Sequence, residues 1–132
     1  MEILNSDKEG IKKAAKIITS GEIIFIPTDT VYGIAANPYN NKAIKKLFSI
    51  KKRSINNSLI LLCSNYKMAK KYAFFNKIAE KLKKKFWPGP LTLILKRKPN
   101  SRISNKWLPK NNSVGIRIPN HKFTLDIIEG FK

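Results

Sequence analysis

The segment Gly21–Ala36, with the sequence GEIIFIPTDTVYGIAA, decides the fold because a strand pattern runs directly into a turn rich in hydroxyl groups. The continuous apolar run Ile23–Ile26 has the length of a strand and is typical of a sheet whose two faces are both covered. Pro27 has no amide hydrogen and therefore ends the ladder of hydrogen bonds. The polar side chains of the turn that follows are Thr28, Asp29, Thr30 and Tyr32.

This turn has two interpretations. Loops at strand ends present polar groups on a rigid base, so the turn can orient a small polar ligand. Thr and Asp side chains also form ordinary local turns, in which they bond only to neighbouring backbone groups. The segment by itself favours neither interpretation over the other.

The charge of the chain also has two explanations. The 132 residues include 27 Lys and Arg against 8 Asp and Glu, and this length suits one domain with its own core. A formal net charge of +19 favours a polyanionic partner, because clustered cations release counterions from nucleic acid. However, only four of the cations are Arg, and Lys, Ile and Asn together supply 55 residues, as a genome rich in A and T also produces.

Cysteine usage and hydropathy indicate the environment of the protein. Cys63 is the only cysteine, so no internal disulfide can form, and its apolar neighbours predict a buried side chain. No apolar run approaches the ~20 residues that span a bilayer, and the first residues lack the pattern of a secretory signal. We therefore expect a cytoplasmic protein with no membrane association.

Strands and helices alternate along the chain. Apolar runs and turn signals predict strands at 23–26, 31–36, 59–63, 91–96 and 114–118. Capping signals and helical periodicity predict helices from a capping box at Ser6 to Gly21, from Asn40 to 51, over 65–86 in two pieces, and over 121–129. Residues 97–112 are predicted to form a long polar loop. This order predicts an α/β or α+β fold with one twisted mixed sheet flanked by helices.

Three cationic side chains lie at positions where they could bind an anionic ligand. Arg117 lies alone in an apolar strand, and a buried arginine needs a partner, so it should contact Asp29, Asp126 or an anionic ligand. Lys51 and Arg53 end a predicted helix beside a polar loop. There they can hold phosphate groups, or they can simply offset the helix macrodipole.

Four segments follow one another along the chain: PTDTVYG at 27–33, KKR at 51–53 followed by NNSLILL at 56–62, WPGPLTLIL at 87–95, and VGIRIP at 114–119. Taken together and in this order, they resemble the YrdC/TsaC family of threonylcarbamoyl-adenylate synthases. The resemblance covers about 11–131 and implies a YrdC-like domain over 1–132. The Ser-x-Asn segment that contacts ATP in the family does not follow Arg117 in this sequence, so the domain is expected to lack that portion.

The resemblance implies a nucleotidyltransferase. Enzymes of the family join L-threonine, bicarbonate or CO2, and ATP into L-threonylcarbamoyladenylate, with release of pyrophosphate. Mg²⁺ accompanies the ATP, and no metal site of the protein itself is implied. A threonylcarbamoyl-transfer complex then modifies tRNA, so tRNA or double-stranded RNA is a further expected partner.

Carried over position by position, the resemblance assigns roles to six residues. L-threonine is expected at Thr30 and Arg117, although Arg117 could instead hold nucleotide phosphates. The catalytic cations are expected to be Lys51 and Arg53. The expected ATP contacts are Lys51, Arg53, Asn57 and Thr92.

Two other functions remain open at this point. The first is a non-catalytic or decayed YrdC-like module that binds double-stranded RNA or tRNA, as the basic composition would favour. The second is an accessory of carbamoyl transfer, like the YrdC-like domain of hydrogenase-maturation carbamoyltransferases. Those proteins carry acylphosphatase and zinc-finger regions, neither of which occurs in this sequence, so the second alternative is the least favoured.

Overall fold

The computed structural model describes residues 2–51, 59–99 and 102–131. The helices are α1 (Lys8–Thr19), α2 (Asn41–Lys51), α3 (Tyr66–Ala69), α4 (Lys77–Phe86) and α5 (Lys122–Gly130), with a 3-10 helix η1 (Asn105–Trp107). The strands are β1 (Ile24–Ile26), β2 (Gly33–Ala35), β3 (Ile60–Leu62), β4 (Leu93–Lys96) and β5 (Ser113–Arg117). Among the described helices, none combines the length and the apolar character that crossing a bilayer requires.

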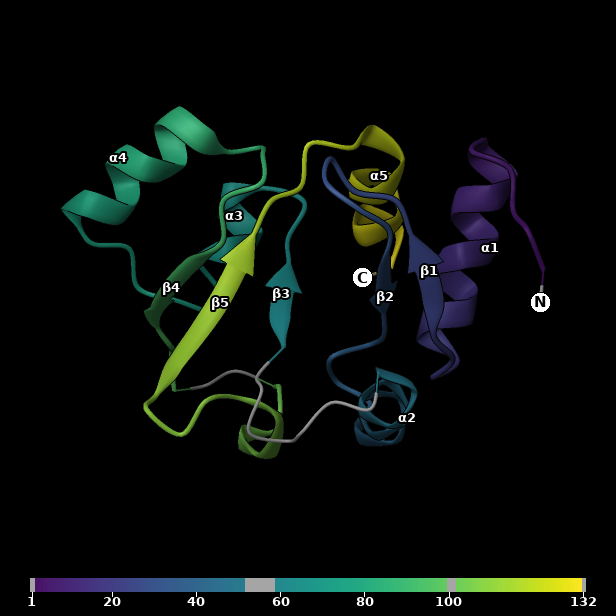
Figure 1. Ribbon diagram of the computed structural model, residues 1–132, viewed down its shortest axis with the longest axis horizontal. Coiled ribbons are helices and arrows are strands. Elements are labelled where there is room, and N and C mark those ends of the chain that lie inside the picture. The colour runs from purple at the N-terminus through teal and green to yellow at the C-terminus, as the bar shows by residue number, and fades with distance from the viewer. Residues whose placement is uncertain (1, 52–58, 100–101, 132) are drawn as a thin grey trace.

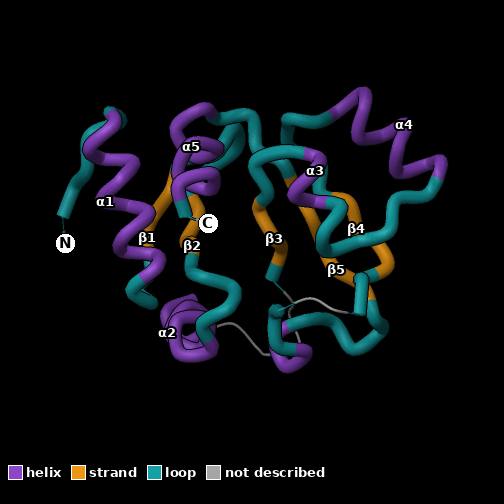
Figure 2. Tube along the Cα trace, turned by 180° about the vertical axis from the view of Figure 1, so that it is seen from behind, coloured by secondary structure: helices purple, strands orange, loops and turns teal. Residues whose placement is uncertain are grey.

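The strands form two hydrogen-bonded groups that lie next to each other (Figure 1). In the three-stranded sheet, β5 is central, parallel to β3 and antiparallel to β4. The second group is the antiparallel pair of β1 and β2. The view from behind shows α3 on the three-stranded side and α5 beside β2 (Figure 2). The predicted α/β fold with a mixed sheet flanked by helices is confirmed, and its ladders divide into these two groups within the described residues.

Helix α1 begins one residue later than the sequence predicts. The carboxylate of Asp7, rather than the hydroxyl of Ser6, caps the helix and accepts a 2.8 Å hydrogen bond from the amide of Gly10. Gly10 is required there, because a Cβ atom at this position would lie 1.8 Å from the carbonyl oxygen of Asn5. The backbone before the helix therefore packs directly against its first turn.

The predicted end of α1 at Gly21 is confirmed. Gly21 has a φ of 92°, a left-handed conformation that costs little only for glycine. Its amide bonds to the carbonyl of Ile18, and the next amide, that of Glu22, bonds to the carbonyl of Ile17. These two bonds form a Schellman motif that turns the chain into β1.

The prediction that both faces of the first strand are covered is wrong. Ile24 and Ile26 pack with Ala14 and Ile18 of α1 in one apolar cluster. Phe25 points to the opposite face, where its side chain is 59% exposed. An unbroken apolar run hides the alternation of faces that β-strand geometry imposes, so the sequence does not reveal the open face.

The segment 97–112, predicted to be a polar loop, contributes to the core. Trp107 in η1 stacks on Phe48 of α2, with ring centroids 5.5 Å apart, and donates a 2.8 Å hydrogen bond from its indole nitrogen to Asn41. Ile103 and Leu108 are also buried. Isolated apolar residues among polar ones have no strand or helix period, so their burial leaves no periodic signal in the sequence.

We expect Trp107→Ala to lower the free energy of unfolding by about 3–5 kcal/mol, because it removes a buried aromatic ring and leaves a cavity. Urea denaturation followed by circular dichroism measures this loss. Lys110→Ala, an exposed substitution in the same segment, is the matched control and should change stability by less than about 0.5 kcal/mol. Equal effects of the two substitutions would show that this segment is not part of the core.

Candidate functional site

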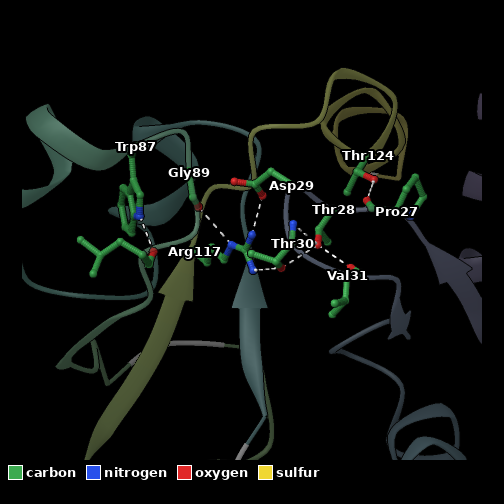
Figure 3. Close-up of polar contacts among 10 residues, drawn as sticks. Pro27, Thr28, Asp29, Thr30, Val31, Trp87, Gly89, Arg117 and Thr124 are labelled. Carbon is green, nitrogen blue, oxygen red and sulfur yellow. Dashed lines mark hydrogen bonds and ion pairs between the residues drawn. The ribbon is translucent and has the colours of Figure 1, made fainter.

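Arg117, the last residue of β5, joins three separate parts of the chain. Its Nε donates a 3.0 Å hydrogen bond to the carbonyl of Gly89, and one terminal nitrogen donates a 3.2 Å bond to the hydroxyl of Thr30. The other terminal nitrogen forms an ion pair with the carboxylate of Asp29. Figure 3 shows all three partners converging on one guanidinium group. The buried strand end thus holds a cation in a fixed orientation.

The predicted need of Arg117 for a partner is confirmed. Only 8% of the residue is exposed, so an unpaired guanidinium would be costly. Of the two candidate carboxylates, Asp29 is the partner, whereas Asp126 pairs with Lys122 on the surface of α5 at 3.1 Å. The alternation of β5 directs Arg117 toward the turn that follows β1.

Hydrogen bonds to the Asp29 carboxylate outweigh its partial burial and lower its pKa. Although the residue is exposed as a whole, only 16% of its side chain is accessible. Burial alone would raise the pKa of this carboxyl group. Hydrogen bonds from its own backbone amide, from Arg117 and from the amide of Asn120 reverse that effect and hold the pKa below its usual value.

The interpretation of the Thr28–Thr30 turn as a local turn is confirmed for Thr28, whereas its role in orienting a ligand stays a prediction. The hydroxyl of Thr28 donates to the carbonyl of Val31 at 2.5 Å and accepts from the amide of Thr30 at 3.2 Å, so it stabilises the turn locally. The hydroxyl of Thr30 also accepts a hydrogen bond from Arg117, 87 residues away in sequence. Thr30 therefore belongs to the long-range site.

The WPGP segment supplies a rigid wall on the other side of Arg117. The amide of Gly89 donates a 2.8 Å bond to Ile118, and the indole nitrogen of Trp87 donates a 2.7 Å bond to the carbonyl of Leu91. A Cβ atom at Gly89 would lie 2.3 Å from the carbonyl oxygen of Phe86, so only glycine fits there. The carbonyl that accepts from Arg117 is thus held by the surrounding turn.

A cavity of about 510 Å³ opens beside these residues. Of the six residues to which the resemblance assigns roles, Thr30, Lys51 and Arg117 contribute to its lining, as do Thr28 and Tyr32 of the turn after β1. The rest of the lining is largely apolar. Thr92, which lies just before β4, does not belong to this lining. Arg53 and Asn57 lie outside the described residues, so their predicted roles stay predictions.

The structure adds residues that sequence reasoning missed. The hydroxyl of Thr124, fully buried in α5, donates a hydrogen bond to the carbonyl of Pro27 and so anchors the start of the turn. On another wall of the cavity, the hydroxyls of Tyr39 and Tyr72 are hydrogen-bonded to each other, and the guanidinium of Arg102 lies 4.3 Å from the Tyr39 ring centroid. No local motif marks these residues, because each acts through a distant partner.

The described part of the chain contains no cluster of three or more His, Cys, Asp or Glu side chains that could hold a metal ion. The polar groups of the cavity are hydroxyls and cations, which suit the binding of anionic and zwitterionic molecules.

Comparison with known proteins shows which family the chain belongs to. The Sua5/YciO/YrdC family model, described as "Telomere recombination", matches residues 16–132. The chain belongs to the Sua5/YciO/YrdC family. A relative from Methanocaldococcus jannaschii is 41% identical over 112 residues, which are 85% of this chain and 52% of that protein. A relative from Pyrococcus abyssi named threonylcarbamoyl-AMP synthase is 36% identical over 121 residues, which are 90% of this chain and 35% of that protein.

Solved structures of the Sua5/YciO/YrdC family agree with the fold described above. The crystal structure of P. abyssi Sua5 complexed with L-threonine matches with a TM-score of 0.87 and 33% identity, covering 98% of this chain and 37% of that one. The chain thus spans about a third of the P. abyssi protein and about half of the M. jannaschii relative.

The ion pair of Asp29 should make folding sensitive to acid. Because the folded state lowers the pKa of Asp29 from its unfolded value of about 3.9, the unfolded chain binds more protons between the two values, and stability rises with pH there. This contribution is fully present above the unfolded pKa and is lost as the pH falls through the folded-state pKa. We expect Asp29→Asn to remove this part of the profile, measured by urea denaturation between pH 2.5 and pH 7.

The control for this measurement is Asp126→Asn, because the ion pair of Asp126 with Lys122 is exposed and contributes little. Unchanged acid sensitivity in Asp29→Asn would contradict a folded-state role for the pair.

Proposed function

We propose that this chain acts as a threonylcarbamoyl-AMP synthase, which forms L-threonylcarbamoyladenylate and pyrophosphate from L-threonine, bicarbonate or CO2, and ATP. The observation that carries the proposal is the convergence of Thr30, Arg117 and Lys51 on one cavity. The printed name of the P. abyssi relative and the L-threonine complex of its Sua5 support this choice of substrates.

Arg117 can bind the carboxylate of L-threonine without losing its protein partners. A guanidinium has five N–H donors, and the three described bonds use one donor on each nitrogen. One N–H therefore remains on each terminal nitrogen, as required for a two-point contact with a carboxylate. Thr30, whose hydroxyl lies 3.2 Å from Arg117, is close enough to contact the same amino acid.

The reaction needs positioning more than a strong protein base. The threonine amine captures CO2 as a carbamate, and a carbamate oxygen attacks the α-phosphorus of ATP in line, so that a P–O bond forms and pyrophosphate leaves. Lys51, and Arg53 by the resemblance, would offset charge on the phosphates, with Asn57 and Thr92 as further nucleotide contacts. Alignment of reactants lowers such barriers by ~7–11 kcal/mol in favourable cases.

Mg²⁺ enters this proposal as the partner of the ATP phosphates. In phosphoryl-transfer sites Mg²⁺ keeps several water ligands and is bound through substrate phosphates with one or two carboxylates. Bicarbonate, the cytoplasmic location, the transfer complex that passes the product to tRNA, and the single domain over 1–132 without a Ser-x-Asn portion all remain predictions.

We expect purified protein, supplied with L-threonine, bicarbonate, Mg²⁺ and ATP, to release pyrophosphate in a coupled assay. Lys51→Ala should slow the release by roughly 10- to 150-fold, the range for losing a charge-assisted hydrogen bond. Lys45→Ala removes an exposed lysine of the same helix that does not contribute to the lining of the cavity, and it should retain activity. Release no faster than in Lys51→Ala would contradict the proposal.

We also expect Arg117→Lys to weaken L-threonine binding by roughly 10- to 150-fold in calorimetric titrations, because one ammonium cannot replace the two-point contact. Thr30→Ser keeps the hydroxyl and should bind within a few-fold of the native chain. Thermal unfolding of both variants separates a loss of binding from a loss of folding. If native protein and Arg117→Lys bind L-threonine equally well, the amino acid binds elsewhere.

A further inference from the structure

The two strand groups turn unpaired edges toward each other. In the described residues β2 is paired only with β1, and β3 is paired only with β5. The other edge of each strand therefore carries backbone N–H and C=O groups that no strand in this part of the chain satisfies. Figure 1 and Figure 2 both show β2 and β3 as the neighbouring strands of the two groups. An unpaired edge is a template for a further strand, and here two edges face each other.

The cavity of about 510 Å³ lies between these two edges. Every residue of β2 and every residue of β3 contributes to its lining. Helix α5, which lies beside β2 in Figure 2, adds Ile127 and Ile128, and Phe131 follows directly after that helix. The cavity is thus bounded by two strand edges and by an apolar helix surface.

The cavity is long enough for an extended segment of polypeptide. Strands β2 and β3 have three residues each and therefore span about 10 Å, at ~3.3 Å per residue. The lining continues past β2 in both directions, to Thr30 before the strand and to Tyr39 after it. A segment of about five residues, the commonest strand length, therefore fits along both edges.

The lining and the net charge determine which side chains such a segment needs. Most of the lining is apolar, and among the described residues it includes two cations, Lys51 and Arg117, but no carboxylate. The formal net charge of the whole protein is +19. A field of this sign attracts an acidic partner and repels a second copy of the same chain. These surroundings favour an apolar segment, with carboxylates outside its apolar residues, carried by an acidic polypeptide.

We propose that the cavity receives a β-strand from a second, acidic polypeptide, which pairs with the free edges of β2 and β3 and joins the two strand groups into one sheet. Addition of a strand to an exposed edge is a recurring mode of peptide recognition.

This inference does not rest on the proposed function, because the two concern different parts of the cavity. Thr30 precedes β2, and Arg117 is paired with Leu62, the last residue of β3. L-threonine is therefore assigned to one end of the cavity, whereas the added strand uses the backbone edges.

These edges distinguish a polypeptide from other apolar ligands. The residues of β2 are half-buried, so their backbone groups are partly withdrawn from water. A lipid tail or a small apolar molecule would fill the cavity but leave the N–H and C=O groups of both edges without partners, which costs free energy. A strand supplies a donor or an acceptor to each edge in turn.

The experiment measures fluorescence anisotropy of a labelled peptide that has five Val and Ile residues between two pairs of Glu. The control peptide carries Pro at the central position, which removes one amide donor and interrupts strand pairing. We expect the native chain to bind the first peptide at least tenfold more tightly than the control peptide.

Hydrogen exchange locates the bound segment. The first peptide should slow exchange of the amides in 33–35 and 60–62 at least fivefold, because pairing protects backbone amides from solvent. The amides of β4 should exchange as in the free protein, since β4 lies on the far side of β5.

A matched pair of variants tests the position of the strand. Ile60 of β3 is 44% exposed and contributes to the lining, whereas Ile94 of β4 is 66% exposed and does not. The two side chains flank Gly115, where a Cβ atom would lie 3.0 Å from Ile60 and 3.2 Å from Ile94. Ile60→Glu should weaken binding of the first peptide at least fivefold, because it places a carboxylate against an apolar strand. Ile94→Glu should bind within twofold of the native chain, and thermal unfolding confirms that both variants are folded.

Four results would overturn the proposal. The first is equal binding of the two peptides, which would assign binding to apolar burial alone. The second is protection in β4 as strong as in β2 and β3, or no protection in either edge. The third is an equal loss of affinity in Ile60→Glu and Ile94→Glu. The fourth is a dimer of the peptide-free chain, detected by sedimentation, that protects the same amides, because a second copy would then occupy the cavity.

Discussion

The structure depends on the need to satisfy one buried guanidinium. Removing a charge from water costs several kcal/mol unless partners replace the lost hydration. Arg117 meets this requirement with groups that lie 28, 87 and 88 residues away in sequence. The guanidinium is therefore fully satisfied only where the WPGP turn, the turn after β1 and the end of β5 come together.

This requirement matters because the strand ladders alone do not hold the two halves together. In the described residues β2 pairs only with β1, and β3 pairs only with β5. The contacts that bridge them include polar bonds at the strand ends, the stacking of Trp107 on Phe48 and the packing of α5. Thr124 of α5 bonds to the carbonyl of Pro27, and Ile127 packs with Ile26 and Ile18. The candidate site thus lies at the junction of the two strand groups, where structural and binding roles share the same side chains.

Local signals in the sequence predicted much of this fold. Gly21 ends α1, Asn40 caps α2 through a 3.0 Å bond to the amide of Ala43, and Arg117 finds one of its three expected partners. Burial was harder to predict, because it depends on which face the rest of the chain covers. Phe25 lies in an apolar run yet faces outward, whereas Trp107 lies in a polar stretch yet packs in the core.

The candidate site shows the same division between local and long-range information. A motif can place Thr30 and Arg117 in a turn and a strand, but only the packing of the two strand groups against each other makes them neighbours. The ion pair between Arg117 and Asp29 is largely shielded from solvent, so dissolved salt screens it much less than it screens an exposed pair such as Lys122 and Asp126. The same burial that makes the guanidinium costly to leave unpaired therefore also keeps its orientation fixed when the salt concentration changes.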